Sequence, residues 1–167
     1  GEYFDMPFGV EAVVANKVYV FGDDQLSGPT IVHGYDVVGG VPLVGSTYQT
    51  NITTVAGQWT ELDLGWSFLG DFLLAIEVTT TIGIAIDADN SPSTNSWANL
   101  GGWEPWYDIA MGYGLTDGEF GIRANVTTTG GMTPTFNVYR SAEGGPFNIM
   151  FNGQDITENE YNDNMVQ

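Results

Sequence analysis

The sequence contains no cysteine and only one histidine, His33. The first absence excludes disulfide bonds and thiolate chemistry. Together they exclude a zinc site built from histidine and cysteine. No serine lies in the G-x-S-x-G motif of hydrolases, and no glycine-rich phosphate-binding motif occurs. A pair of catalytic carboxylates stays open, since the sequence does not give their separation, but we predict no catalytic residue and a protein that is not an enzyme.

Basic residues are also scarce. Lys17, Arg123 and Arg140 are outnumbered by 21 acidic residues, which gives a formal net charge of −18. Charged residues still make up only 14% of the chain, against roughly 25% in an average protein, so the imbalance reflects missing cations. A surface of this kind repels phosphate backbones and anionic lipid. We expect no nucleic-acid partner, and divalent cations are the natural counter-charge.

Long hydrophobic runs are missing as well. Asp71 and Glu77 interrupt the most apolar stretch, FLGDFLLAIEV, so no segment approaches the roughly 20 residues needed to cross a bilayer. We expect no membrane insertion. The chain opens in mid-pattern with GEYFDMPFGVEAV and no signal peptide, which is typical of a processed or excised piece of a longer chain.

Alternation of period two is present throughout, whereas helical periodicity is almost absent. It predicts strands in NKVYVFGDD, TIVHGYDVV, VPLVGSTYQ, QWTELDLG and GEFGIRANVTT, and a hairpin that joins DFLLAIEV to IGIAID through Thr79 to Thr81. The 23 glycines and 7 prolines separate these segments at short intervals. The predicted fold class is therefore all-β, an antiparallel β-sandwich of jelly-roll type with a short C-terminal β extension.

The small, polar stretch TGGMTP, residues 129–134, predicts a linker. It would separate a β-sandwich domain, residues 1–128, from residues 135–167, which supply too few strands for an independent domain. The apolar side chains of this tail would be shielded from water in one of three ways: by packing on the sandwich, by further residues of a longer chain, or by strands exchanged with a neighbouring copy. The apolar tail side chains that need cover are Phe136, Val138, Phe147, Ile149 and Phe151.

Two stretches resemble modules of secreted bacterial proteins. The series FGDFLLAIEV, IGIAIDADNSPSTNSW, GGWEPW and FGIRANV is similar to β-sandwich accessory modules of bacterial secreted peptidases and surface proteins, where GDFWVGIE, IGIDTDSPSGNSW and FMIRA recur in order. The tail series FNVYRSAEGGPFNIMFNG and ITENEYNDN resembles part of a fibronectin type III-like repeat. These resemblances imply a non-catalytic role and an extracellular or cell-surface location.

The loop after IGIAID is crowded with oxygen-bearing side chains, which are the ligands that Ca²⁺ prefers. The spacing does not fit the EF-hand template, and the alternative is that these side chains hydrogen-bond the loop backbone. The candidate calcium ligands are Asp87, Asp89, Asn90 and Asn95 in this loop, and Asp23 and Asp24 at the end of an earlier strand.

The segment WANLGGWEPWYD gathers four aromatic residues, Trp97, Trp103, Trp106 and Tyr107. They can form a stacking platform for the sugar rings of a polysaccharide. The alternative, which we favour, is that the rings cover the hydrophobic core at an open end of the sandwich.

The sequence therefore predicts a non-catalytic extracellular module for adhesion or scaffolding, with Ca²⁺ as a candidate stabilising ion. Its partners would be neighbouring domains of a longer chain or other copies of itself. One alternative is a subunit of an extracellular filament or sheath that assembles by strand exchange. A further alternative is a carbohydrate-binding module.

Overall fold

The computed structural model describes residues 1–6, 9–130, 139–140 and 149–150. The chain divides into two units, residues 1–131 and residues 132–167. In the second unit, β13 (Tyr139–Arg140) pairs antiparallel with β14 (Ile149–Met150). Of the tail residues that were predicted to need cover, Ile149 is in β14, and the other four, Phe136, Val138, Phe147 and Phe151, lie outside the described residues. Strand exchange stays a prediction.

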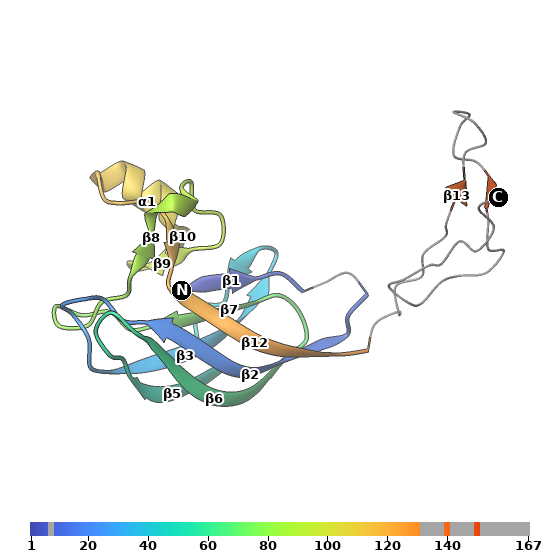
Figure 1. The fold of residues 1–167 in the computed structure, drawn as a ribbon, viewed down its shortest axis with the longest axis horizontal. Helices are drawn as coiled ribbons and strands as arrows, with labels where there is room; N and C mark the ends of the chain where they lie inside the picture. Colours follow the sequence, from blue (N-terminus) through green and yellow to red (C-terminus); the bar gives the residue numbers. More distant parts are fainter. Residues whose placement is uncertain (7–8, 131–138, 141–148, 151–167) are drawn as a thin grey trace, which may run out of the picture. The chain divides into compact units, whose positions relative to one another are not determined.

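The first unit is built from antiparallel sheets, which confirms the all-β prediction (Figure 1). One sheet has three strands in the order β12-β2-β6. Asn16 bulges from the central strand, so the inward side chains change from Val13 and Ala15 to Val18 and Val20. The bounds are β2 (Ala12–Phe21), β6 (Trp59–Phe68) and β12 (Ile122–Thr129).

The second sheet has five strands. Its order is β1-β7-β3-β4, and β5 also pairs with β3. The edge of β1 that does not pair with β7 is bonded to residues 95–97, since Glu2 and Ser96 form an isolated antiparallel bridge. The bounds are β1 (Glu2–Phe4), β3 (Pro29–Val38), β4 (Val41–Pro42), β5 (Tyr48–Thr53) and β7 (Phe72–Ile76).

The hydrophobic core lies between these two sheets. Gly34 of β3 lies so close to β6 that a Cβ atom there would be 2.9 Å from the Trp66 ring. Aromatic stacking continues across the core, with the rings of Phe68 and Phe72 4.5 Å apart. Other members of the core are Val18, Val20, Val32, Ile52, Leu74 and Ile122. The pairings establish separate antiparallel sheets, and the sandwich arrangement and the jelly-roll strand order stay predictions.

The remaining elements are short and lie beside one end of the sheets (Figure 1). Strand β8 (Ile86–Asp87) pairs with β11 (Glu119–Phe120), and β9 (Trp97–Asn99) pairs with β10 (Trp103–Pro105). The 3₁₀ helix η1 (Ala88–Asn90) follows β8, and the helix α1 (Trp106–Tyr113) follows β10. The helix ends at Gly114 in the left-handed conformation. In the described part of the chain, no helix has the length and apolar character that a membrane span requires.

The strand predictions succeed along β2, β3, β6 and β12, but the predicted hairpin is wrong. Strand β7 pairs with β1 and β3, whereas β8 pairs with β11. The Thr79 hydroxyl does accept the N–H groups of Thr81 and Ile82 and so makes the expected turn. After the turn, however, the chain crosses to bridge Gly22 at Ile84 instead of returning along β7.

Candidate functional site

The outer face of the five-stranded sheet, which points away from the core, carries a second apolar layer. Alternation along β3 places His33 and Tyr35 on this face, opposite to Val32 and Gly34. In register with them, β7 places Ala75 beside His33 and Leu73 beside Tyr35. Leu73 is 0% exposed although it points away from the core, so another part of the chain covers this face.

Part of that cover comes from the segment 97–106, whose tryptophans are held in fixed orientations. Gly1 also lies close to the Leu73 side chain. The Trp103 ring meets Tyr35 edge to face at 4.9 Å, and its indole N–H donates to the Leu43 carbonyl at 3.1 Å. The Trp106 ring packs against Phe120 at 5.2 Å, and its N–H donates to the Thr116 carbonyl at 3.2 Å. Both indoles are therefore held in place before any ligand arrives.

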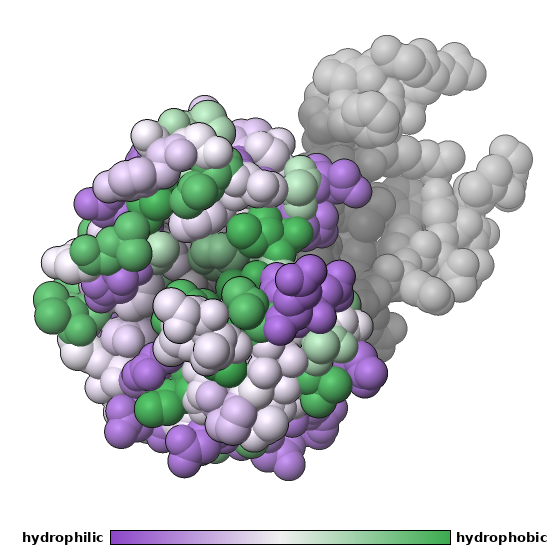
Figure 2. All heavy atoms as spheres, turned by 90° about the vertical axis from the view of Figure 1, so that its left-hand side faces the viewer, coloured by the Kyte–Doolittle hydropathy of each residue, from purple (hydrophilic) through white to green (hydrophobic). Residues whose placement is uncertain are grey.

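A hollow of about 640 Å³ remains between the outer face of the sheet and this cover. Its size is within the range of small-molecule sites in proteins. Leu100 and Val78 are largely exposed, so they form a rim open to solvent. Figure 2 shows hydrophobic residues gathered around the middle of one face of the molecule. The hollow is lined mainly by Leu26, Tyr35, Ala75, Val78, Ile82, Ile86, Trp97, Ala98, Leu100, Trp103, Trp106 and Phe120.

One polar pair, His33 and Glu77, borders this apolar hollow. His33 Nε2 lies 2.9 Å from Glu77 Oε1, and His33 Nδ1 lies 3.2 Å from Ser46 Oγ. Because a carboxylate only accepts hydrogen bonds, Nε2 carries a proton and donates to Glu77. In the neutral ring Nδ1 then accepts the Ser46 hydroxyl proton. The imidazole is 12% exposed and the Glu77 side chain 53% exposed, so the carboxylate reaches solvent at the edge of the hollow.

The four aromatic residues singled out in the sequence do not all share one site. Trp97, Trp103 and Trp106 line the hollow. Tyr107 lies in the first turn of α1 and is exposed, outside the residues that line the hollow. The three indoles cover the outer face of a sheet, so they have features of both expected roles, a cover for apolar side chains and a lining for a ligand.

A second polar centre holds the loop 91–96 through Asp117, which is buried. Ser93 donates its hydroxyl to Asp117 Oδ1 at 2.7 Å, and Ser91 donates to Oδ2 at 2.8 Å. The Ser93 backbone N–H also donates to Oδ2. Burial by itself would raise the pKa of Asp117, but the hydrogen bonds from Ser93, Ser91 and Gly118 outweigh it and lower the pKa. This carboxylate stays ionised and fixes the loop.

Glu2 and Glu119 complete this centre by sharing the hydroxyl of Ser96. Ser96 Oγ is hydrogen-bonded to Glu2 Oε1 and lies 2.7 Å from Glu119 Oε2. The Ser96 hydroxyl is the donor in both contacts, and because it has one proton it serves only one of the two carboxyl groups at a time. The Phe120 N–H also donates to Glu2 Oε1. Glu119 Oε1 also accepts the Thr94 N–H at 2.6 Å.

The two glutamates have opposite pKa shifts. Burial is the main cause that raises the pKa of Glu2 from 4.5 to about 7, against the hydrogen bonds from Ser96 and Phe120. For Glu119 burial acts in the same direction, but the donors Thr94, Ser96 and Asn95 outweigh it and lower the pKa. A carboxyl group with a raised pKa and one with a lowered pKa therefore lie on either side of one serine.

The candidate calcium ligands are mostly engaged in local turns. Asp23 Oδ1 accepts the N–H groups of Gln25 and Leu26, and Asp87 Oδ1 accepts the N–H of Asp89 at the start of η1. In the described residues, no three His, Cys, Asp or Glu side chains gather as a metal-binding group.

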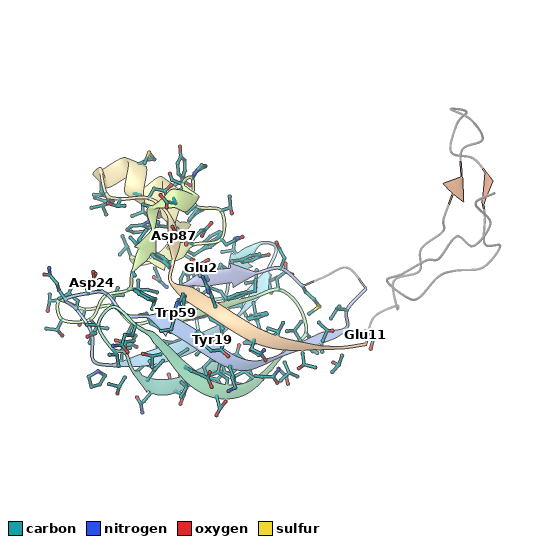
Figure 3. All side chains as sticks on the ribbon, viewed as in Figure 1. Glu2, Glu11, Tyr19, Asp24, Trp59 and Asp87 are labelled. Carbon is teal, nitrogen blue, oxygen red and sulfur yellow. The ribbon has the colours of Figure 1, made fainter. Side chains whose placement is uncertain are left out.

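The remaining candidates are also dispersed. Asp89 and Asn95 border a shallow hollow of about 530 Å³ beside Glu119, and Asn90 is in η1. Asp24 lies on a different loop, apart from Asp87 (Figure 3). Calcium binding stays a prediction.

Sequence reasoning missed the partners of the residues that it singled out. Glu2 and Glu119 were given no role from the sequence, and Ser46 and Glu77 were not indicated as partners of His33. The signal that was available is the series of four hydroxyl residues from Ser91 to Ser96, because buried hydroxyls need acceptors.

Comparison of the chain with protein-family models, with curated proteins and with solved structures found no match. The resemblance to bacterial accessory modules and to fibronectin type III-like repeats therefore stays a prediction. The fold and the site define a class no narrower than an all-β protein with an aromatic-lined hollow on the outer face of one sheet.

Proposed function

We propose that the chain is a non-catalytic binding module of an extracellular or cell-surface protein, serving adhesion or scaffolding, and that it holds its ligand in the hollow. The observation that carries this proposal is the cavity of about 640 Å³ whose walls include Trp97, Trp103 and Trp106 beside the pair His33 and Glu77. Apolar walls with a few placed polar groups are the usual form of a ligand site.

The rigidity of the walls also supports a binding role. Two of the indoles are fixed by N–H donation to backbone carbonyls, and His33 is held on both ring nitrogens. A preorganised site loses little side-chain entropy when a ligand binds. The resemblance of residues 60–126 to accessory modules supports the extracellular, adhesive setting.

The proposal is tested by titrating ligands into the unchanged protein and into the variants Trp103→Ala and Trp59→Ala, with tryptophan fluorescence as the measure of binding. Trp59 lies in the other sheet, where Arg123 stacks over its ring at 4.4 Å, and it is a matched control. A panel of small apolar and glycan ligands should shift the fluorescence of the unchanged protein. Trp103→Ala should weaken binding at least tenfold, and Trp59→Ala should leave it unchanged. Equal affinities in the two variants would contradict a site in the hollow.

A carbohydrate-binding module is the second candidate, favoured by the three indoles because sugar rings stack on tryptophan faces. Retention on a panel of insoluble polysaccharides tests it, with Trp106→Ala as the variant. If the unchanged protein is retained on a polysaccharide and the Trp106→Ala variant is not, the result supports a carbohydrate-binding module. No retention of the unchanged protein on any polysaccharide would reject it.

A further inference from the structure

We propose that the ligand of the hollow is an amphiphilic amine, a molecule with an apolar chain or ring and one primary ammonium group that Glu77 binds. The inference rests on the proposed function, because that proposal places a ligand in the hollow. It adds the chemical class of the ligand, which follows from the walls, from the charges at the rim and from the remaining acceptor capacity of Glu77.

The walls fit an apolar body better than a hydroxylated one. Apart from the indoles they are largely aliphatic, with Leu26, Ile82 and Ile86 on one side and Ala75 on the floor. Sugar hydroxyls against these side chains would lose water without gaining partners, which is unfavourable. An alkyl chain gains about fourfold in affinity for each methylene group that it buries.

The charges at the hollow favour a cation. Of the described residues that line it, none is Lys or Arg, and Glu77 is the one carboxylate. The amino group of Gly1 also lies there and contacts the Trp97 carbonyl at 2.7 Å, but burial lowers its pKa from 8.0 to about 5, so it is neutral at pH 8. The two basic residues of the described part of the first unit lie on the other sheet, where Lys17 is paired with Glu61 and Arg123 stacks on Trp59. An anionic ligand would therefore have no counter-charge, whereas an ammonium meets a carboxylate in a protein of net charge −18.

Glu77 has capacity left for this role. His33 donates to one of its oxygens at 2.9 Å and so orients the carboxylate, and two carboxylate oxygens accept about four hydrogen bonds. The side chain is 53% exposed, so an incoming ammonium can reach it.

Three ligands with the same eight-carbon body test the class: octylamine, octanol and octanoate, titrated at pH 8 by tryptophan fluorescence and calorimetry. Octylamine should bind at least tenfold tighter than octanol, and octanoate at least tenfold weaker than octanol. Hexylamine should bind roughly fifteenfold weaker than octylamine, since two methylene groups are lost.

The variant Glu77→Gln should remove the preference for octylamine and leave octanol binding unchanged. Glu104→Gln, which changes an exposed glutamate of β10 outside the lining residues, should change neither. Val78→Lys adds a cation at the exposed rim and should turn the preference toward octanoate. Circular dichroism of each variant checks that the fold is kept.

The outcomes separate the two proposals. If the three ligands bind equally, or octanoate binds tightest, the proposal that the ligand is an amine is wrong. In that case the hollow is still the binding site if Trp103→Ala weakens the binding of all three ligands. If an amine preference survives Glu77→Gln while Val78→Lys has no effect, Glu77 is not the binding group and the inference is wrong. If none of the ligands binds, both the class and the hollow as their site are overturned.

Discussion

At the scale of single residues, the chain concentrates its unusual chemistry in buried carboxyl groups that are satisfied by hydroxyls and backbone amides. Glu2 is 6% exposed and its nearest partners are Ser96 and the Phe120 N–H. A group in this position is stable when neutral, because an ionised carboxylate loses its hydration on burial. Asp117 and Glu119 show the contrary case, in which several donors keep the charge.

The free energy of unfolding should depend on the protonation of Glu2. Its pKa is raised from 4.5 when exposed to about 7 in the fold. The folded state therefore binds the extra proton, and the stabilisation is full below pH 4.5 and is lost as the pH rises to 7. The Glu2 contribution to this loss is about 3 kcal/mol. Burial lowers the pKa of the Gly1 amino group from 8.0 to about 5, which adds a change of opposite sign over the same pH range. The Glu2 contribution is therefore measured by urea denaturation between pH 5 and pH 8 as the difference between the unchanged protein and Glu2→Gln.

Glu2→Gln isolates this effect. The neutral amide should remove the Glu2 contribution, so that the variant matches the unchanged protein near pH 4.5 and exceeds it by up to about 3 kcal/mol at pH 8. The exposed Glu104→Gln is the control and should keep the pH profile of the unchanged protein. A pH profile of Glu2→Gln that is parallel to that of the unchanged protein would show that Glu2 is ionised in the fold.

At the scale of elements, the long strands of the sheets could be predicted from the sequence, whereas the packing of the segment 97–106 over the outer face of one sheet could not. Alternation alone identified β2, β3, β6 and β12, because one face of each strand is buried and the other is not. The hairpin from β7 to β8 failed because a turn shows only that the chain reverses, and long-range pairing decides which strand it meets. The bulge at Asn16 likewise depends on pairing with both neighbours.

The site was predictable in its composition and not in its geometry. The three tryptophans that line the hollow were recognised as a group, because they are close in sequence. Helix α1 was not predicted, since its eight residues include Gly112, are followed by Gly114 and have little apolar periodicity. The pair of His33 and Glu77 joins residues 44 positions apart, and no local pattern contains that information.

Gly118 holds the pairing of β8 with β11. Its φ is +150°, and a Cβ atom there would lie 2.3 Å from the Asp87 carbonyl oxygen. Gly118→Ala should therefore destabilise the fold by about 1–3 kcal/mol, measured by urea denaturation. The matched control is Gly112→Ala in α1, where a Cβ atom meets nothing within 4 Å. The control should be neutral or stabilising by up to about 1 kcal/mol, and a loss of stability no larger in Gly118→Ala than in Gly112→Ala would contradict the close packing.

The loop 88–96 should keep its stability without calcium. Its serines donate to Asp117 and Glu119, and the Asp87 carboxylate caps η1, so hydrogen bonds can replace the role of an ion. We expect the same melting midpoint in a metal chelator and in excess calcium chloride, with magnesium chloride as the control for ionic strength. A midpoint that rises with calcium and not with magnesium would instead support the calcium prediction from the sequence.

At the scale of the whole molecule, charge is the property that opposes folding. The net charge is −18. In the described part of the chain, Lys17 pairs with Glu61 and Asp63, whereas Arg123 stacks on an aromatic ring. Most carboxylates therefore have no cationic partner within the fold, and folding brings like charges closer together.

Salt should stabilise this protein by screening that repulsion. Raising sodium chloride from 0.05 M to 0.5 M shortens the Debye length from about 14 Å to about 4 Å. We expect an increase in the free energy of unfolding on the order of 1 kcal/mol, which raises the melting midpoint by about 2–4 °C. Sodium bromide at the same ionic strength should give the same rise, because screening depends on ion charge and concentration. The repulsion also disappears when the carboxylates are neutral, so the effect should shrink as the pH falls toward the sequence pI of 4.1. A midpoint that is independent of salt at pH 8 would mean that the acidic residues are too far apart in the fold to repel one another.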